Sequence, residues 1–201
     1  MQSYKDLVHK VLNYGQLRHN RTGVDAISLF GASLRHNMED GMPILTTKKI
    51  NIKACIYELL WFLKGDTNIK YLNDNGVHIW DAWADENGDL GPVYGKQWRD
   101  SGKRHIDQVQ NAINLIQNDP LSRRIIIDAW SPSDIFDMAL PPCHVLYQFY
   151  ADPETMTLSL CVYMRSADLF LGVPFDIAEG AMLLQLVATV TGYWCKELIY
   201  Y

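Results

Sequence analysis

The chain has 201 residues, with 18 Lys and Arg against 23 Asp and Glu, and therefore a formal net charge of −5. This length suits one domain, which can bury a core without disulfides or metal ions. With 48% hydrophobic and 20% charged residues, the composition excludes a disordered chain. The negative charge argues against sequence-independent binding to nucleic acid, which depends on Lys and Arg at the phosphates. We expect a single domain over residues 1–201 with no obligatory nucleic acid.

The four cysteines lie far apart and form no C-x-x-C pair; they are Cys55, Cys143, Cys161 and Cys195. This spacing favours reduced thiols in a cytoplasm over a disulfide framework or a zinc site. Residues 1–20 lack the apolar core of a signal peptide, and no apolar run approaches the roughly 18 residues of a membrane span. We expect a cytoplasmic protein with no metal and no membrane partner.

Helical periodicity occurs in four segments. The first has apolar residues on one face between positions 4 and 12, with Ser3 as the expected N-cap and Gly15 as the stop. The second covers residues 52–63, carries Glu58 near its apolar stripe and ends at Gly65. Residues 106–116 predict a third helix, closed by residues 118–120, and residues 178–191 predict a buried fourth.

Four β-like runs lie between these helices, at residues 26–30, 124–130, 144–150 and 157–163. The last two flank a short polar segment, residues 151–155, and so predict a hairpin. Helices and strands do not alternate strictly, which favours an α+β fold with a mixed sheet over a doubly wound fold. Residues 81–97 form a long, aromatic and polar loop, and loops of that length usually serve a function.

Cys143 follows two prolines and directly precedes a predicted strand, so a rigid turn could present its thiol to a cleft. Taken alone, a cysteine is more often a small core residue than a nucleophile. A thiolate needs nearby positive charge at neutral pH, and Arg165, on the next β segment, could supply it. The neighbouring His144 suggests a cysteine hydrolase, but adjacent strand residues point to opposite faces, so His144 is a poor candidate base for Cys143.

Four arginines, Arg21, Arg123, Arg124 and Arg165, could converge on one dianionic phosphate, for which the guanidinium fork is suited. If Arg123 and Arg124 begin a strand, their side chains diverge, and one of them can reach beyond its own domain. Any one of these arginines considered alone is better explained as a solvated or ion-paired surface residue.

Aromatic side chains crowd the long loop; they are Trp80, Trp83, Tyr94 and Trp98. They could stack a planar heterocycle or simply close the edge of the core. Asp176 opens the last apolar helix, where capping alone would explain a carboxylate.

Taken together, these motifs resemble the thymidylate synthase family, including its relatives that modify deoxycytidylate. The resemblance runs along essentially the whole chain. It is carried by residues 21–23, 43–49, 58–63, 65–68, 79–81, 91–95, 122–124, 142–144, 148–150, 165–166 and 168–175, in this order.

The resemblance implies a large mixed sheet with helices on one face and a homodimer formed through the other face. It implies that Cys143 adds to C6 of a pyrimidine nucleotide, whose C5 then attacks the methylene of 5,10-methylenetetrahydrofolate, a co-substrate. Glu58 and Tyr94 would manage protons. The nucleotide would be bound by Arg21, Gln148, Arg165, Ser166, Asp168 and Asp176, with Arg123 and Arg124 from the second subunit. The reduced folate would be bound by Ile79, Trp80, Trp83, Asp168, Leu171, Gly172 and Phe175.

Asp176 departs from the family pattern, because thymidylate synthases have an asparagine at this base-reading position. A carboxylate has only acceptors and would face uracil O4 lone pair to lone pair, whereas cytosine offers an N4 amino donor. The carboxyl and cytosine N3 could also share a proton. The sequence therefore predicts dCMP as the substrate, with methyl or hydroxymethyl as the group added.

Other departures concern the folate contacts and the end of the chain. Asn51 and Ala54 differ from folate-binding positions of many synthases, and Glu179-Gly180 replaces the usual Ser-Tyr. The chain ends at Tyr201, before the family's His-x-Tyr segment that holds the ribose and before its folate-covering tail. Three alternatives follow: a cytidylate transferase, a thymidylate synthase that converts dUMP to dTMP despite Asp176, or a truncated, catalytically silent nucleotide-binding dimer.

Overall fold

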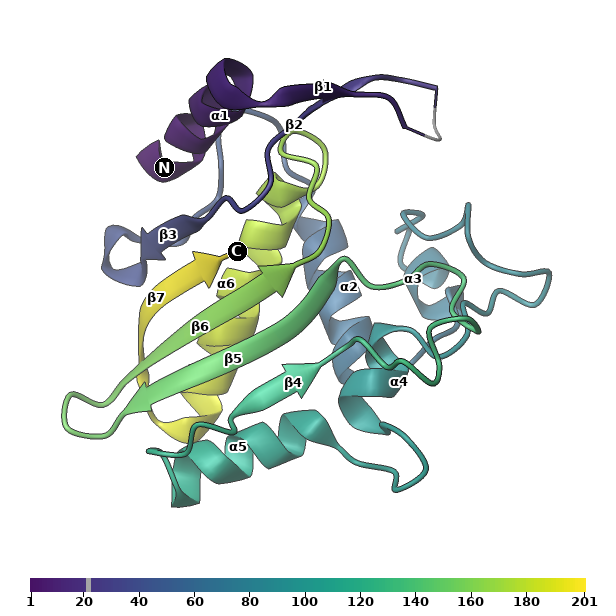
Figure 1. Cartoon of the computed structure of the whole chain (residues 1–201). Helices are drawn as coiled ribbons and strands as arrows, with labels where there is room; N and C mark the ends of the chain where they lie inside the picture. The colour runs from purple at the N-terminus through teal and green to yellow at the C-terminus, as the bar shows by residue number, and fades with distance from the viewer. Residues whose placement is uncertain (21–22) are drawn as a thin grey trace.

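A computed structural model describes residues 1–20 and 23–201, and its elements form an α+β fold with a mixed sheet, as the sequence predicts (Figure 1). The described helices are α1 (Gln2–Tyr14), the 3₁₀ helix η1 (Met38–Asp40), α2 (Ile52–Leu63), α3 (Lys70–Asp74), α4 (Tyr94–Arg99), α5 (Gln108–Asn118) and α6 (Val173–Thr191). The described strands are β1 (Gln16–Arg18), β2 (Ala26–Ser28), β3 (Leu34–Asn37), β4 (Ile126–Asp128), β5 (His144–Asp152), β6 (Thr157–Met164) and β7 (Trp194–Tyr200).

The main sheet has the strand order β3-β7-β6-β5-β4, and β1 and β2 form a separate antiparallel pair. The predicted hairpin is confirmed, since β5 and β6 pair antiparallel from His144 opposite Met164 to Asp152 opposite Thr157. The sheet is mixed because β7 lies parallel to β6, after the chain has returned through α6. This return brings the start of α6 and the start of β5 to the same end of the molecule (Figure 1).

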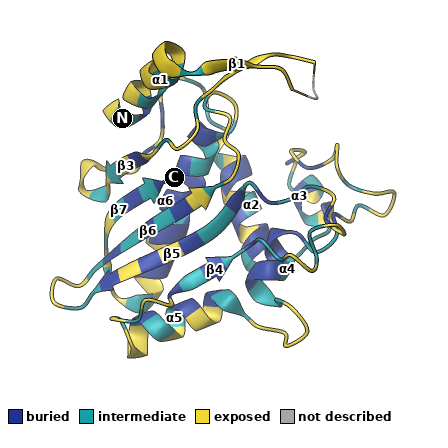
Figure 2. Ribbon diagram, in the orientation of Figure 1, coloured by how far each residue is buried: buried dark blue, intermediate teal, exposed yellow. Residues whose placement is uncertain are grey.

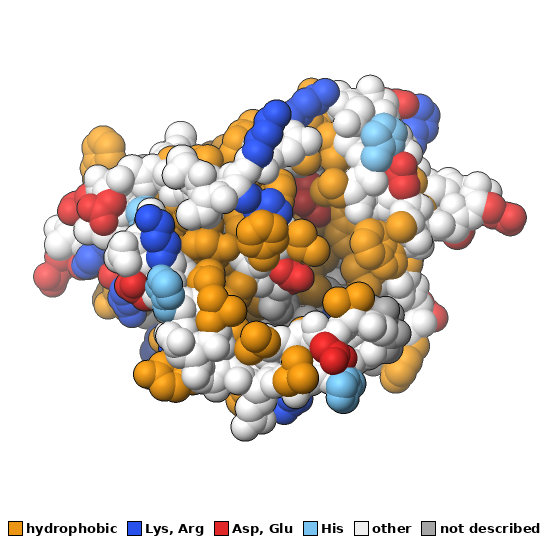
Figure 3. Space-filling model, turned by 90° about the horizontal axis from the view of Figure 1, so that it is seen from above, with side chains coloured by type: hydrophobic (Ala, Val, Ile, Leu, Met, Phe, Trp, Pro, Cys, Tyr) orange, Lys and Arg blue, Asp and Glu red, His pale blue; other side chains and the backbone are white. Residues whose placement is uncertain are grey.

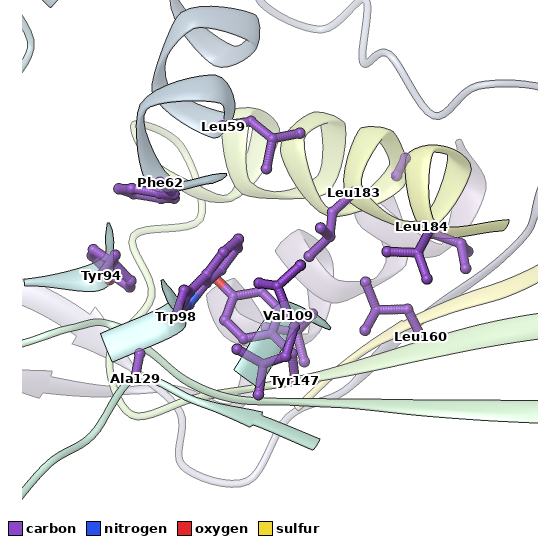
Figure 4. Close-up of a cluster of buried hydrophobic side chains, with 14 of the residues drawn as sticks. Leu59, Phe62, Tyr94, Trp98, Val109, Ala129, Tyr147, Leu160, Leu183 and Leu184 are labelled. Carbon is purple, nitrogen blue, oxygen red and sulfur yellow. The ribbon is translucent and has the colours of Figure 1, made fainter. Parts of the chain in front are cut away.

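The helices α2, α5 and α6 cover one face of the sheet, and the core lies between the two layers (Figure 1). Leu59 of α2 and Leu183 of α6 point toward Trp98 and Tyr147, whose ring centroids lie 5.0 Å apart (Figure 4). Burial of such side chains stabilises the fold by about 1.5–3 kcal/mol each. Packing in this core holds α2, α4 and α6 against the sheet. These three helices carry residues of the candidate site.

None of the described helices covers the opposite face of the sheet (Figure 1). Along β5 and β6 buried residues alternate with less buried ones, as expected for a sheet with one open face (Figure 2). Gln148, Tyr150 and Tyr163 are exposed there, with Tyr150 at 70%. The predicted dimer through this face is consistent with its apolar content and remains a prediction.

The fourth predicted helix is longer than expected, because α6 begins at Val173 rather than near residue 178. Pro174 lies in its first turn, where proline is favoured, and Gly192 ends it in the left-handed conformation. By length and composition, α6 alone among the described helices could cross a membrane. Eleven of its residues are buried in the core, which accounts for its apolar sequence.

Several boundaries were predicted wrongly. Ser3 is not an N-cap, since α1 begins at Gln2. Arg123 and Arg124 lie in the turn before β4 rather than within the strand, so the diverging strand geometry predicted for them is wrong. The long loop contains the helix α4. The strands β1 and β3 were not predicted, because three or four residues are too few to show an alternating pattern. The strand β7 was not predicted either, although it has seven residues and lies between β3 and β6.

Candidate active site

Cys143 is the last residue before β5, directly after Pro141 and Pro142, as the sequence predicts. Its backbone is held from two sides. The Cys143 amide donates to Tyr94 Oη at 2.7 Å, and the Cys143 carbonyl accepts from the amide of Arg165 at 3.0 Å. The half-buried thiol is therefore held at a fixed point at the end of the sheet.

Arg165 follows β6 directly and lies beside the Cys143 turn. Its Nε donates to the Pro142 carbonyl at 2.9 Å and its Nη2 to the Pro141 carbonyl at 2.8 Å. Burial raises the pKa of the Cys143 thiol, and the charge of Arg165 opposes this without cancelling it. The thiol therefore holds its proton in the free protein and needs an acceptor for it when it attacks.

Glu58 projects from α2, and its Oε1 accepts a hydrogen bond from Trp80 Nε1 at 2.7 Å. Burial raises the pKa of Glu58 from 4.5 to about 7; the Trp80 hydrogen bond and His144 act in the opposite direction. Both protonation states are therefore populated near neutral pH. A group of this kind can accept and return protons during a reaction.

Tyr94 begins α4, and its hydroxyl joins the site to the sheet. Besides Cys143, the amide of His144 donates to Tyr94 Oη at 3.3 Å. The ring packs against Phe62 with centroids 4.6 Å apart. Burial raises the pKa of the Tyr94 phenol well above its ordinary value, so the group keeps its proton and remains able to donate one.

Asp176, in the first turn of α6, faces His144 at the start of β5. His144 Nε2 lies 3.2 Å from Asp176 Oδ1, and both side chains are largely buried. Burial lowers the pKa of His144, but Asp176 and Glu58 together raise it above its ordinary value. The pairing of Asp176 with His144 was not predicted, since the sequence alone favoured a helix cap for Asp176.

The predicted folate residues lie in two segments, residues 79–83 and residues 168–175. Trp80 is buried, whereas Trp83 is 44% and Leu171 is 64% exposed. Asp168 Oδ1 accepts from the amides of Phe170 and Leu171, at 2.9 and 2.7 Å, and so fixes the turn that presents Leu171. Exposed apolar side chains beside buried ones suit the binding of a flat ring system.

One face of the molecule is hollowed. Figure 3 views the molecule from above, onto the end where β5 and α6 begin, and shows a hollow bordered largely by hydrophobic side chains. The remaining predicted folate residues lie in the same two segments: Ile79 is exposed beside Trp80, and Gly172 and Phe175 lie at the start of α6. The Lys48 ammonium lies 5.0 Å from the centroid of the Phe175 ring.

Some predicted nucleotide residues lie elsewhere in the chain. Arg123 and Arg124 are exposed in the turn before β4. Because Ile126 pairs with Gln148, this turn lies roughly 20 Å along β5 from Cys143. Gln148 is exposed on the open face of the sheet and Ser166 is exposed next to Arg165, while Arg21 lies outside the described residues.

Sequence reasoning missed two buried residues of this site, His144 as a partner of Asp176 and Glu179 one turn further along α6. The available signal was the acidic pair in an otherwise apolar helix, since residues three apart share a helix face.

A family model described as thymidylate synthase matches residues 2–201 of the chain.

Proposed function

The chain belongs to the thymidylate synthase family, and from this premise we propose that it acts on a cytosine nucleotide, dCMP. Membership implies a transferase that uses methylenetetrahydrofolate to transfer one carbon to C5 of a pyrimidine nucleotide. The choice of base, the residue roles, the single domain over residues 1–201 and the cytoplasmic location are our proposals.

One observation carries the choice of cytosine, namely the carboxyl group of Asp176 beside His144. With His144 Nε2 at Oδ1, the carboxyl has its second oxygen for a donor such as the cytosine N4 amine. Uracil would place its O4 acceptor there, and an unpaired buried polar group costs about 1–3 kcal/mol. That cost corresponds to a preference of roughly fivefold to more than a hundredfold for cytosine.

In the proposed mechanism the Cys143 sulfur forms a bond to C6 of the pyrimidine, which turns C5 into a nucleophile. C5 would then bond to the methylene carbon of the folate while a folate nitrogen leaves that carbon. The C5 proton would pass to a water molecule, and breaking of the C6–S bond would return its electron pair to sulfur and release Cys143. Tyr94, whose hydroxyl lies at the Cys143 amide, keeps its own proton, so its part in removing the C5 proton would be to orient the water molecule that accepts it. Glu58 passes protons through water, for which a pKa of about 7 is suited.

We propose that the phosphate is bound by groups from two subunits, since members of this family are typically dimers. Arg165 and Ser166 are exposed beside Cys143, and Arg21 belongs to the same set. Arg123 and Arg124 are too far from Cys143 within one chain, which supports their contribution to the partner subunit. The open face of the sheet, with exposed Tyr150 and Tyr163, is the proposed interface.

We propose that the folate lies beside Trp80, with Ile79, Trp83, Leu171, Gly172 and Phe175 around it and Asp168 touching both ligands. The exposure of Trp83 and Leu171 supports this placement, because each offers an apolar surface that a ring could cover. Whether hydride or water completes the reaction decides between a methyl and a hydroxymethyl product, and both outcomes suit these residues.

Release of tritium from C5 of dCMP and of dUMP, measured with methylenetetrahydrofolate, tests the choice of base. We expect faster release from dCMP, and we expect Asp176→Asn to shift the preference toward dUMP by about tenfold or more. Asp40→Asn, on the exposed η1 helix, is a matched control that should leave the ratio unchanged. Faster release from dUMP by the unmodified protein would show a thymidylate synthase instead.

Covalent trapping with 5-fluoro-dCMP tests the role of Cys143. The unmodified protein should form an adduct in the presence of the folate, and Cys143→Ser should form none, because the hydroxyl is a far weaker nucleophile than the thiol. Mass spectrometry of the intact protein detects the adduct. Failure of the unmodified protein to trap either 5-fluoro-dCMP or 5-fluoro-dUMP would support a catalytically silent dimer.

A further inference from the structure

Glu179 is a buried carboxyl group in α6, a long and largely apolar helix. It lies one turn after Asp176 in α6, and only 8% of its surface is exposed. Its Oε1 has no hydrogen-bond partner among the described residues. Such a group costs about 1–3 kcal/mol of stability when unpaired, and the family function derived above gives it no task.

A small internal cavity lies against Glu179. Its volume is about 10 Å³, close to the smallest space that holds one water molecule, and its lining includes Trp98, His144, Asp176 and Glu179. Three further buried polar atoms of these lining residues, Trp98 Nε1 and both ring nitrogens of His144, make no hydrogen bond within the described part of the chain, although His144 Nε2 lies 3.2 Å from Asp176 Oδ1. Three unpaired polar groups around one cavity satisfy the requirement of a buried water for two to four partners.

The chemistry of the three groups is complementary. Trp98 Nε1 can only donate, and a neutral carboxyl both donates and accepts. If His144 holds its proton on Nε2, toward Asp176 Oδ1 at 3.2 Å, its Nδ1 can only accept. One water can accept from Trp98, exchange a hydrogen bond with Glu179 and donate to His144, so that every group has a partner.

The described groups that face Glu179 come from five elements. They are Glu58 and Cys55 of α2, Asp176 of α6, Trp98 of α4, His144 and Tyr147 of β5, and Tyr200 of β7. Of these only His144 can carry a positive charge. Burial, followed by the charges of Glu58 and Asp176, raises the pKa of Glu179 well above its ordinary value.

We propose that Glu179 is a positioning residue that, in its neutral form, binds a water molecule together with Trp98 Nε1 and thereby holds His144 with its proton on Nε2, toward Asp176. The water donates to His144 Nδ1, which keeps that nitrogen unprotonated. Asp176 consequently receives one fixed donor and has one oxygen left for the base. The link to base choice rests on the proposed function, whereas the water site and the histidine tautomer do not.

Nitrogen-15 NMR of the His144 imidazole in the ligand-free protein tests the tautomer, with the signal assigned by its loss in His144→Asn. At alkaline pH, where the imidazole is neutral, the unmodified protein should show a protonated Nε2 and an unprotonated, hydrogen-bonded Nδ1. Glu179→Gln keeps a neutral group of the same shape and should keep this pattern. Glu179→Leu should lose it, and Glu154→Gln, in the exposed hairpin turn, is the control that should not. A proton on Nδ1, or an unchanged spectrum in Glu179→Leu, would overturn the proposal.

A high-resolution crystal structure of the unmodified chain tests the water independently of any variant. A water within hydrogen-bond distance of Trp98 Nε1 and His144 Nδ1 is expected, and a dry cavity would refute the proposal even if Glu179→Leu does not fold. In activity measurements, Glu179→Leu should reduce the ratio of kcat/KM for dCMP over dUMP by about tenfold, and Glu179→Gln should restore it. A preference for dUMP with the tautomer as expected would instead refute only the proposed choice of base.

Discussion

The titration of Glu58 gives the most direct test of the electrostatics of the site, because it can be measured in the ligand-free protein. Glu58 ionises with an ordinary pKa of 4.5 in the unfolded chain and with a pKa of about 7 in the folded one, where burial opposes its charge. Between these two pH values the folded protein keeps a proton that the unfolded chain releases. The stability that this proton provides is complete below pH 4.5 and is lost as the pH rises to about 7.

The expected size follows from the two pKa values. A rise of the Glu58 pKa from 4.5 to about 7 on folding corresponds to a change of about 3 kcal/mol in the free energy of unfolding. Glu58→Gln removes the ionisation but leaves an amide oxygen that can still accept from Trp80 Nε1. Relative to the unmodified protein, the variant should therefore gain about 3 kcal/mol in stability as the pH rises through this window.

Urea denaturation at a series of pH values from 4 to about 8 measures this difference, with the slope against urea as a check on two-state behaviour. The test depends on how the difference in unfolding free energy between the variant and the unmodified protein changes with pH. The absolute difference does not matter, because the substitution also has an effect on packing that is independent of pH. Glu154→Gln, in the exposed hairpin turn, serves as the control. If the difference in unfolding free energy between Glu58→Gln and the unmodified protein stays constant across this pH range, burial does not raise the pKa of Glu58 and the reasoning is refuted.

Two glycines give further tests by urea denaturation. Gly91→Ala should cost about 3 kcal/mol, because the residue has a φ of 73° and its Cβ would lie 2.1 Å from the Asp137 carbonyl oxygen; Gly41→Ala, with a φ of 93° but open space around it, should cost less. Gly180→Ala should destabilise by about 1–3 kcal/mol despite the helix preference for alanine, since its Cβ would lie 2.2 Å from Tyr200 Oη. Adding Tyr200→Phe should recover part of that loss, and purely additive effects would contradict the contact.

The parts of the fold that could be predicted from sequence are those with a local pattern. The apolar residues of α2 recur at helical spacing, and β5 and β6 are joined by a short polar turn. The helix and the hairpin were therefore located correctly. The pairing of β7 with β3 and β6 depends on contacts between distant segments. A strand of four residues such as β3 has too short a pattern to be distinguished from a loop.

The site shows the same division between local and distant information. Cys143 could be selected because two prolines precede it, and Arg165 because a thiol needs a cation, and the structure brings their backbones into direct contact. His144 was set aside because strand neighbours point to opposite faces. Its role depends on Asp176, which is 32 residues later in the sequence, and no local pattern could indicate that the two side chains lie 3.2 Å apart.

The choice of base and the transfer of protons are linked through one charge. Asp176, the residue proposed to select cytosine, also raises the pKa of Glu58, the residue proposed to move protons. An asparagine at this position removes that charge, so it would alter both the hydrogen-bonding pattern at the base and the proton held by Glu58. Because Asp176 adds a negative charge beside Glu58, a third carboxylate next to these two would be unfavourable. The neutral state of Glu179 avoids that charge, since among the described groups that face Glu179 only His144 could balance it.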